Sequence, residues 1–364
     1  MSRALVMIMA GGTGGHIFPG LAVARALREQ GYRIAWLGTK AGLEARLIPD
    51  AGIPLHTLAV RGLRGKSLVS LTSGLARLAW SIVQAIVILM RERPAVVIGM
   101  GGYVAAPGGL AAFLTRSPLF IHEQNAVAGS TNRFLRRFAS RVFTAFDGAF
   151  VGSTEAEWIG NPVRSDIAAV GDQRNPYAPE RALRVLVLGG SQGALAINRL
   201  LPDVLVEMDK NGTSAGLEVW HQVGKAHLDK VTQEYASRGF SETRVSAFIE
   251  DMAAAYEWAD VVIARAGALT CSEVTAAACP AVLIPLPNAI DDHQRKNAAF
   301  LADVGAAIVL EQADTSAGQL AELCIAFTRA PERLSNMMEA ARSIAKLDAT
   351  QRMVRACEEA IDDR

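Results

Sequence analysis

Three glycine-rich segments each follow a run of apolar residues, and the backbone amides of such segments can bind phosphate. They are GGTGGH at residues 11–16, GMGGY at 99–103 and GGSQG at 189–193. Glycine lets the backbone approach a ligand closely, and the helix that follows presents free N–H groups to an anion. One such segment alone is equally well explained as a tight turn between a strand and a helix. Three of them, with one opening each half of the chain, favour anion binding.

None of the three segments carries the fingerprint of a common nucleotide-binding loop. No Gly-Lys-Ser/Thr follows any of them, so they are not P-loops. Ile17 stands where the dinucleotide fingerprint needs its third glycine. The next predicted strand ends in WLGT at residues 36–39, without the acid that holds a ribose 2′-hydroxyl. These differences argue against an NAD-dependent oxidoreductase and leave open a diphosphate held by backbone amides.

A further segment, ARAGALTCSE at residues 264–273, places a carboxylate just after a glycine turn. It leaves a predicted strand, turns at Gly267 and begins a helix. Glu273 can accept hydrogen bonds from both hydroxyls of a ribose, while Thr270 and the amides of Ala268 and Leu269 can bind phosphate at the helix N-terminus. Two other interpretations remain: Glu273 is a solvated helical residue, or it closes a capping box with Thr270.

The elements that must position these residues alternate regularly along the chain. Predicted strands lie at 4–9, 32–38, 95–99, 118–122 and 141–146, and again at 183–190, 217–223, 243–248, 260–267 and 281–287. Amphipathic segments separate them, which indicates βαβ units and a parallel sheet. Residues 169–182 break the pattern, after which it restarts with a strand, a glycine turn and a helix. The sequence therefore predicts an α/β protein with two Rossmann-like domains that face each other across a deep cleft. The glycine segments that open the two halves of the chain are expected to line this cleft.

The composition agrees with two domains and shows that they differ in charge. The chain has 364 residues, of which 51% are hydrophobic, enough for a sizeable core. Its formal net charge is only +1. Residues 1–164, however, carry 18 Lys and Arg against 8 Asp and Glu, whereas residues 165–364 carry 19 against 28. This asymmetry indicates an anionic surface or ligand on the side of the first half.

The most hydrophobic stretch, residues 75–90, is too short to cross a bilayer. Only 13 uncharged residues separate Arg77 from Arg91, against the roughly 20 that a membrane-spanning helix needs. It is either a buried helix of an α/β core or a helix that lies on a membrane surface. Basic residues on both sides of it suit anionic lipid headgroups: Arg61, Arg64, Lys66, Arg77, Arg91 and Arg93.

The cysteines and the N-terminus indicate a protein of the cytoplasm. The four cysteines form no CxxC pair and have no histidine at metal-ligand spacing, so we expect free, mostly buried thiols in a reducing compartment. The first apolar run has no small-residue cleavage site and continues directly into the first glycine segment. It is therefore predicted to be a strand and not a signal peptide.

Taken together, the chain resembles the MurG family of peptidoglycan N-acetylglucosaminyltransferases, in glycosyltransferase family 28. The resemblance runs essentially from end to end. It rests on GGTGGHIFPGLAVA (11–24), GMGGYVAAP (99–107), HEQNAVAG (122–129), GNPVR (160–164), GGSQGA (189–194), RAGALTCSE (265–273) and DDHQRKNA (291–298). A glycine segment alone would be weak support, whereas HEQN, GNPVR and the GALT–SE segment in this order are specific.

The resemblance implies a fold, a reaction and a place in the cell. The fold is GT-B: residues 1–163 form an acceptor- and membrane-associating domain, with the C-terminal helix 345–364 packed back on it, and residues 164–344 bind the UDP-sugar. The reaction is inverting transfer of N-acetylglucosamine from UDP-N-acetylglucosamine to the 4-hydroxyl of the N-acetylmuramoyl unit of lipid I, giving lipid II and UDP. No cofactor or metal ion is implied in the active site, and no nucleic acid as partner. The enzyme would lie peripherally on the cytoplasmic face of the inner membrane, bound to its anionic surface.

The same resemblance assigns the nucleotide end of the donor site to the second domain. Glu273 would hold the ribose diol, and Arg164 would lie near the nucleotide. Ile249 would bind the uracil through its backbone, with Phe248 beside it. Residues of the two glycine turns would contact the phosphates and the adjoining part of the donor: Ser191, Ala268, Leu269, Thr270, Cys271 and Ser272.

The sugar end of the site is expected to draw on both domains. Gln294 would lie near the sugar hydroxyls. Family members often carry two adjacent glutamines here, whereas this chain reads His293-Gln294-Arg295. The residues of the first domain that would face the transferred sugar and the acceptor are Thr13, Gly14, Gly15, His16 and Asn125.

The implied reaction needs a base, and His16 is the candidate because imidazole titrates near neutrality. Glu123 and Asn125 are the other possible participants. A structural role for His16, in orienting the glycine segment or donating a hydrogen bond to substrate, remains open. No Asp-x-Asp motif offers a magnesium site, since the aspartates at 291–292 are adjacent. Helix N-termini, loop amides and Arg164 would then stabilise the leaving diphosphate.

Functions of other classes are kept as alternatives. One is a soluble enzyme of the same fold, similar to a UDP-N-acetylglucosamine 2-epimerase. Another is a membrane-bound nucleotide-sugar sensor that does not catalyse a reaction. An NAD oxidoreductase is the third, already weakened by the broken fingerprint.

Overall fold

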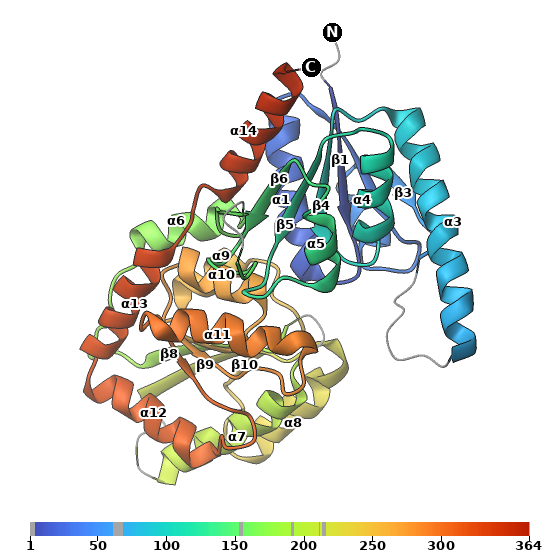
Figure 1. Ribbon diagram of the computed structural model, residues 1–364. Coiled ribbons are helices and arrows are strands. Elements are labelled where there is room, and N and C mark those ends of the chain that lie inside the picture. The colour runs from blue at the N-terminus through green and yellow to red at the C-terminus, as the bar shows by residue number, and fades with distance from the viewer. Residues whose placement is uncertain are drawn as a thin grey trace. The chain divides into compact units, whose positions relative to one another are not determined.

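A computed structural model describes residues 4–60, 68–152, 156–190, 193–210, 212 and 216–363 of the chain. The chain divides into two compact units (Figure 1). The first, here the N-terminal domain, comprises residues 1–163 and 346–364. The second, the C-terminal domain, comprises residues 164–345. The chain therefore passes between the domains twice, at Val163–Arg164 and at Ala345–Lys346.

The N-terminal domain is built on a seven-stranded sheet in the order β3-β2-β1-β4-β5-β6-β7. Its strands are β1 (Leu5–Ala10), β2 (Arg33–Gly38), β3 (Leu55–Thr57), β4 (Val96–Gly101), β5 (Leu119–Glu123), β6 (Arg141–Thr144) and β7 (Ala156–Trp158). All adjacent pairs are parallel. The strand order reverses between β1 and β4, and the loops after these strands therefore flank the point where open α/β sheets bind ligands.

Helices cover both faces of this sheet because side chains of β1 point alternately to either face. Even-numbered β1 residues pack in a core with α1 (Gly14–Glu29) and α14 (Ala349–Asp362). Odd-numbered ones pack in a second core with α3 (Leu68–Glu92), α4 (Ala105–Leu114) and α5 (Ser130–Leu135). The short α2 (Glu44–Asp50) follows β2.

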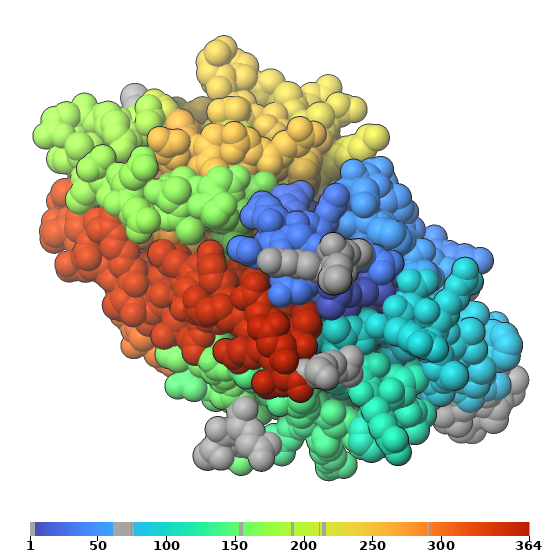
Figure 2. All heavy atoms as spheres, turned by 90° about the horizontal axis from the view of Figure 1, so that it is seen from above, coloured from blue at the N-terminus to red at the C-terminus, as the bar shows by residue number. Residues whose placement is uncertain are grey.

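The C-terminal helix α14 is an integral part of the N-terminal domain. Its Met353 and Cys357 are fully buried in the same core as residues of α1. Figure 2 shows α14, in red, against the blue N-terminal segment. Two ion pairs, Arg352 with Glu157 and Arg141 with Glu359, attach the helix to the strands at the sheet edge.

Helix α3, which contains the most hydrophobic stretch of the chain, is buried on one side and exposed on the other. Ser81, Ala85 and Leu89 are buried against the domain. The opposite stripe, at the three- and four-residue spacing of one helix face, is apolar and 48–63% exposed: Trp80, Val83, Val87 and Met90. Of the two interpretations of this stretch, burial in an α/β core therefore holds for one side of the helix, while the other side is exposed. Within the described residues, no helix has the length and apolar character to span a membrane.

The C-terminal domain repeats the same plan with six parallel strands in the order β10-β9-β8-β11-β12-β13. They are β8 (Leu183–Leu188), β9 (Leu217–Gln222), β10 (Arg244–Ser246), β11 (Val261–Ala264), β12 (Ala281–Leu283) and β13 (Ala307–Val309). Here the strand order reverses between β8 and β11. The glycine segment 189–193 and the glycine turn at Gly267 follow these two strands, at the equivalent place in the sheet.

Helices again cover both faces of the second sheet. One core contains α7 (Leu195–Lys210), α8 (Leu228–Ser237) and α12 (Ala317–Arg329). On the other side α6 (Ser165–Gln173) contacts both α9 (Met252–Trp258) and α10 (Ala268–Ala276). The remaining helices are α11 (His293–Asp303) and α13 (Glu332–Ile344).

The predicted elements are confirmed in kind and in order. All ten predicted strands are present within a few residues of the expected bounds. The three strands that the pattern did not predict, β3, β7 and β13, are three residues long and lie at sheet edges. The equally short β10 and β12 were predicted because each lies within a longer apolar or β-branched run of the sequence.

Candidate functional site

The loops after β1 and β4 lie against each other at the switch point of the N-terminal sheet. A Cβ on Gly102, whose φ is +81°, would lie 2.2 Å from the carbonyl oxygen of Gly11. A Cβ on Gly101, with φ of +104°, would lie 2.7 Å from Nδ1 of His16. Close packing therefore requires glycine at both positions of the second segment. Gly12 is different, because a Cβ there would meet no atom within 4 Å, so its surroundings are open.

A buried carboxylate that the sequence reasoning missed fixes the first glycine segment. Glu44, fully buried at the start of α2, accepts hydrogen bonds from the amide of Gly12 at 3.0 Å and from both the amide and the hydroxyl of Thr39. Thr13 is the N-cap of α1, and the first intrahelical bonds are those from His16 and Ile17 to its carbonyl. The first amides of an α-helix have no carbonyl of their own helix to bond to, and the amides of residues 14 and 15 are in this position.

His16 is the first member of a row of hydrogen bonds through the HEQN segment. Its Nδ1 lies 2.9 Å from Oε1 of Gln124. Nε2 of Gln124 lies 3.1 Å from both Nδ1 and the carbonyl oxygen of His122. Nε2 of His122 lies 2.8 Å from the carbonyl oxygen of Gly160. Burial is the main cause that lowers the pKa of His122 to about 4, so this imidazole is neutral at pH 7.

Glu123 and Asn125 flank Gln124 in the sequence, and the Glu123 carboxylate holds the loop that follows. Oε1 of Glu123 accepts from the amide and the side-chain nitrogen of Asn125 at 3.1 and 3.2 Å. Oε2 accepts from the amide of Gly129 at 3.0 Å and from the side chain of Asn132 at 2.8 Å. Both oxygens of this buried carboxylate are therefore committed to residues 125–132.

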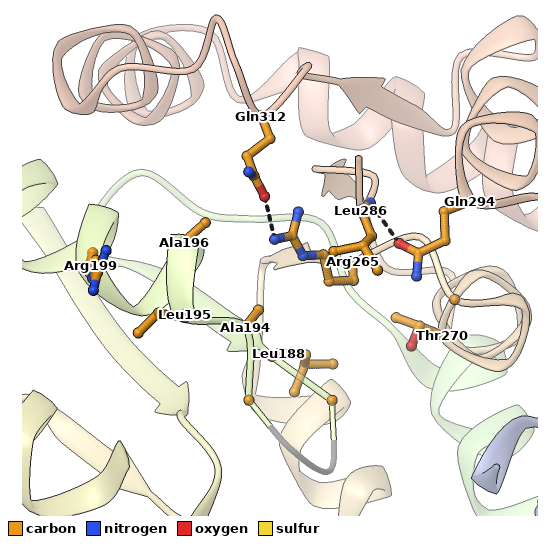
Figure 3. A pocket seen from close by; sticks show the side chains of 14 residues that line it. Leu188, Ala194, Leu195, Ala196, Arg199, Arg265, Thr270, Leu286, Gln294 and Gln312 are labelled. Atoms are coloured by element: carbon orange, nitrogen blue, oxygen red, sulfur yellow. Dashed lines mark hydrogen bonds between the residues drawn. The ribbon is translucent and has the colours of Figure 1, made fainter. Parts of the chain in front are cut away.

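In the C-terminal domain, a pocket of about 570 Å³ lies at the switch point between β8 and β11 (Figure 3). Of the residues expected at the site, Thr270 and Gln294 line it. The rest of the lining comes from the end of β8 and the glycine segment after it, from α7 and from the chain after β11, β12 and β13: Leu188, Gly189, Gly190, Gly193, Ala194, Leu195, Ala196, Arg199, Arg265, Gly267, Leu286 and Gln312. Ser191 falls outside the described residues.

Helix α10 begins at this pocket. Gly267 is its N-cap, and the first intrahelical bond runs from the amide of Cys271 to the Gly267 carbonyl at 2.9 Å. The amides of residues 268–270 precede that bond. The side chains of the next two residues do not line the pocket: Cys271 is buried, which raises its pKa to about 12, and the Ser272 hydroxyl bonds to the Ala268 carbonyl.

Gln294 and Arg265 shape the opposite wall of the pocket. Oε1 of Gln294 accepts from the amide of Leu286 at 2.9 Å, as the dashed line in Figure 3 marks. The guanidinium of Arg265 donates to the carbonyls of Ile284 and Pro285 and to the side chain of Gln312. The sequence reasoning did not select Arg265, although it directly precedes the turn before α10, and no signal pointed to Gln312.

Glu273 lies further along α10, in a separate cluster with Tyr256 and Arg164. The hydroxyl of Tyr256, on α9, donates to Oε2 of Glu273 at 3.0 Å. Burial raises the pKa of Glu273 to about 7, while the hydrogen bond from Tyr256 and the charge of Arg164 act in the opposite direction. Nη2 of Arg164 is buried and has no hydrogen-bond partner among the described residues. An unpaired buried guanidinium nitrogen is suited to receive an anion or another acceptor.

Both alternative interpretations of Glu273 are wrong. The capping box requires Thr270 at the N-cap, but that position is occupied by Gly267 and Thr270 is the third residue of α10. A freely solvated side chain is excluded by the bond from Tyr256 and by the raised pKa.

The structure does not bring all the expected donor residues to one cavity. Glu273 and Arg164 are near each other but do not line the 570 Å³ pocket. Ile249 and Phe248 follow the edge strand β10, with the first buried and the second 54% exposed. The residues expected to face the acceptor all belong to the N-terminal domain. In the described part of the chain, no group of three or more His, Cys, Asp or Glu side chains is arranged to hold a metal ion.

Comparison with known proteins identifies the family. Residues 6–144 match the glycosyltransferase family 28 N-terminal domain, and residues 184–353 match the glycosyltransferase family 28 C-terminal domain. A relative from Halorhodospira halophila, named UDP-N-acetylglucosamine--N-acetylmuramyl-(pentapeptide) pyrophosphoryl-undecaprenol N-acetylglucosamine transferase, is 50% identical over 99% of both chains. The chain belongs to glycosyltransferase family 28. A relative of the same name from Pseudomonas syringae pv. tomato is 50% identical over 97% of this chain and 98% of its own length.

Solved structures give the same family and the GT-B fold. MurG of Acinetobacter baumannii is 38% identical, with a TM-score of 0.82, over 98% of this chain and 100% of its own. The resemblance to the MurG family and the GT-B expectation are thereby confirmed. A UDP-N-acetylglucosamine 2-epimerase from Listeria monocytogenes, described as putative in its name, has a TM-score of 0.68 over 100% of this chain and 98% of its own at 14% identity. That likeness shows a shared fold alone.

Replacing Tyr256 with phenylalanine is expected to raise the pKa of Glu273 further above about 7. The lost hydrogen bond favours the ionised carboxylate by about 1.5 kcal/mol, which corresponds to a shift of about one pH unit. Titration of the Glu273 carboxyl ¹³C resonance measures it. Tyr235→Phe is the matched control, because Tyr235 is bonded to His221 and not to Glu273. An unchanged or lower pKa in Tyr256→Phe would contradict the assignment.

Proposed function

We propose that this protein transfers N-acetylglucosamine from UDP-N-acetylglucosamine to the 4-hydroxyl of the N-acetylmuramoyl unit of lipid I, giving lipid II and UDP for peptidoglycan synthesis. The observation that carries the proposal is 50% identity over nearly the whole length of relatives with that transferase name. The likeness extends through both domains, so it includes both candidate sites. In favour of the epimerase alternative is a likeness of fold at 14% identity.

The C-terminal domain binds the donor in this proposal. The amides at the start of α10 and the glycine segment after β8, with Ser191, hold the diphosphate. Glu273, held by Tyr256, accepts the ribose hydroxyls, and the unpaired nitrogen of Arg164 lies near the nucleotide. The uracil binds the backbone of Ile249. Gln294, fixed through its oxygen to Leu286, presents its amide nitrogen to the sugar hydroxyls.

The N-terminal domain supplies the acceptor side. His16 takes the proton of the acceptor 4-hydroxyl as its oxygen attacks the anomeric carbon, while the bond from that carbon to the diphosphate oxygen breaks and UDP leaves. Single displacement inverts the anomeric centre from α to β. Asn125, oriented by Glu123, contacts the transferred sugar or the acceptor. Because both oxygens of Glu123 are occupied within its own loop, we assign it to positioning and not to proton transfer.

The leaving UDP gains negative charge, and the proposal assigns its stabilisation to the chain itself. The helix start of α10 and the Arg164 guanidinium supply positive potential without a metal ion. Transfer also requires the two sites to face each other across a cleft while the reaction proceeds.

The proposed place of action is the cytoplasmic face of the inner membrane, with the N-terminal domain on the lipid surface. The exposed stripe of α3 continues in apolar side chains of the adjoining α4 and α5 that are 45–56% exposed: Phe113, Leu114 and Phe134. Arg77, Arg91 and Arg93 are exposed beside the stripe. Apolar side chains with flanking cations are typical of helices that lie in an anionic interface. Arg61, Arg64 and Lys66 fall outside the described residues.

The reaction is tested by incubating the purified protein with UDP-N-acetylglucosamine and a polyprenyl-diphosphate-linked N-acetylmuramoyl peptide in buffer containing EDTA. We expect UDP release that needs the acceptor and equals the disaccharide product, because no step uses a metal ion. Conversion of the donor without acceptor would indicate an epimerase, and binding without turnover would indicate a sensor. Loss of activity in EDTA that returns on adding Mg²⁺ would overturn the metal-free mechanism.

Substitutions in the two sites should separate turnover from donor binding. His16→Ala is expected to lower kcat by about 10²- to 10⁴-fold, the usual contribution of a general base, and Asn125→Ala to lower it less. Glu273→Ala is expected to weaken UDP binding by about 10- to 100-fold, since hydrogen bonds to a charged group are lost. Isothermal titration with UDP and steady-state kinetics measure both effects. A similar loss of UDP binding in all three variants would refute this division.

Charge introduced into the α3 stripe should abolish membrane binding. Val87→Glu places a carboxylate among apolar side chains and near anionic headgroups, so co-sedimentation with vesicles containing phosphatidylglycerol is expected to fall about tenfold or more. Val304→Glu is the matched control, because Val304 is 42% exposed in the C-terminal domain. Wild-type binding should also weaken as salt rises. Equal binding by both variants would argue against this surface.

A further inference from the structure

We propose that Gln124 and His122 are positioning residues that hold the His16 ring in the tautomer with its proton on Nδ1, which leaves the lone pair of Nε2 for the acceptor hydroxyl. The inference deepens the proposed function, on which it rests for the identity of the hydroxyl. Its physical basis is the row of hydrogen bonds from His16 to Gly160, whose directions follow from the chemistry of its last member.

The carbonyl oxygen of Gly160 determines which atom donates and which accepts in each hydrogen bond of the row. A carbonyl oxygen only accepts, so Nε2 of His122, 2.8 Å away, carries a proton and donates it. His122 is fully buried, and burial lowers its pKa to about 4, so the ring is neutral. A neutral imidazole with its proton on Nε2 has a lone pair on Nδ1. Nδ1 of His122 is therefore an acceptor.

The orientation of the Gln124 amide then determines which atom donates in the hydrogen bond to His16. Its terminal group meets two acceptors at 3.1 Å, Nδ1 and the carbonyl oxygen of His122. The amide NH₂ supplies two donors and satisfies both, whereas the reversed amide would place its oxygen against two acceptors. The oxygen of Gln124 thus faces Nδ1 of His16 at 2.9 Å. That nitrogen must donate, so in the neutral ring the unprotonated nitrogen is Nε2.

The row is held firmly enough to select one tautomer. His122 and Gln124 are 0% and 1% exposed, and the carbonyl of Gln124 accepts from the side chain of Asn161. At the far end Gly160, with φ of +88°, packs so closely that a Cβ would lie 2.4 Å from Cβ of Lys346. At the near end the ring of His16 occupies the space that a side chain on Gly101 would need.

A neutral amide in this position orients the ring without adding charge. A carboxylate facing Nδ1 would do the same but would also stabilise the imidazolium. The nearest carboxylate in sequence, Glu123, is directed into its own loop. The pH dependence of turnover is therefore a readout that separates positioning of His16 from general support of the fold.

The tautomer is measured directly by long-range ¹H–¹⁵N correlation on protein with ¹⁵N-labelled histidine. His16→Gln identifies the His16 signals. At about pH 8.5, roughly two units above the ordinary histidine pKa, the wild-type ring should show its proton on Nδ1. In Gln124→Leu the proton should move largely to Nε2, with kcat reduced about 10- to 100-fold and KM for UDP-N-acetylglucosamine within about twofold of wild type. Gln84→Leu is the matched control. It removes a glutamine side-chain oxygen that accepts a hydrogen bond from the backbone amide of Ala59, and it should leave the His16 tautomer unchanged.

Gln124→Glu tests the same contact by charge. The oxygen that faces Nδ1 of His16 should still accept its proton, and the acid limb of the kcat–pH profile should shift upward by about one unit or more, because the carboxylate stabilises protonated His16. The second oxygen replaces the NH₂ donor, so this variant also loses the bonds to Nδ1 and the carbonyl of His122. Native signals from the four histidines that do not contact Gln124, namely His56, His221, His227 and His293, show that each variant has folded. A wild-type proton on Nε2, or an unchanged tautomer and kcat in Gln124→Leu, would overturn the inference. A protein with the Nδ1 proton but no acceptor-dependent UDP release would refute the proposed function while the hydrogen-bond assignment held.

Discussion

Both candidate sites depend on one constraint, the reversal of strand order in an all-parallel sheet. In each domain the two strands beside the reversal send their following loops to opposite faces, so that the chain diverges at their carboxyl ends and leaves room there. In the N-terminal sheet this room is partly filled by the loops themselves, because Gly102 packs directly on Gly11. In the C-terminal sheet it remains as the pocket beside Thr270 and Gln294. The same topology thus yields a tightly built edge that positions His16 and an open edge suited to a nucleotide-sugar.

Burial then sets the protonation state of the polar groups near these edges, with opposite consequences for an imidazole and a carboxyl. It lowers the pKa of His122 to about 4 and raises that of Glu273 to about 7, since in each case the charged form loses its hydration. For His122 the result is a neutral ring with one fixed donor and one fixed acceptor. For Glu273 the hydrogen bond from Tyr256 and the charge of Arg164 favour ionisation and so offset part of the effect. Neighbouring groups therefore matter as much to this chemistry as the residues that would touch substrate.

The charge difference between the halves of the chain corresponds to a division between the domains. The excess of Lys and Arg lies within residues 1–164, nearly the extent of the first segment of the N-terminal domain. That domain also presents an apolar stripe on α3, whose other side is buried against the core. The formal net charge of the whole chain, only +1, would by itself argue against attraction to an anionic surface. The distribution favours it, because electrostatic attraction acts over about 8–10 Å and depends on the charges at the contacting face.

The sequence by itself determined the fold class, ten of the strands in their order along the chain, and the family, because these rest on local patterns and on motifs contiguous in the chain. It also singled out His16, Thr270, Glu273 and Gln294 as candidate site residues. Only the tertiary structure decided what these residues contact. Glu44 at the first glycine segment, Tyr256 beside Glu273 and Gly160 at the end of the His16 row come from distant parts of the chain. No local pattern encodes such pairs, since hydrogen bonds between buried groups and the pKa shifts caused by burial exist only once packing has excluded water.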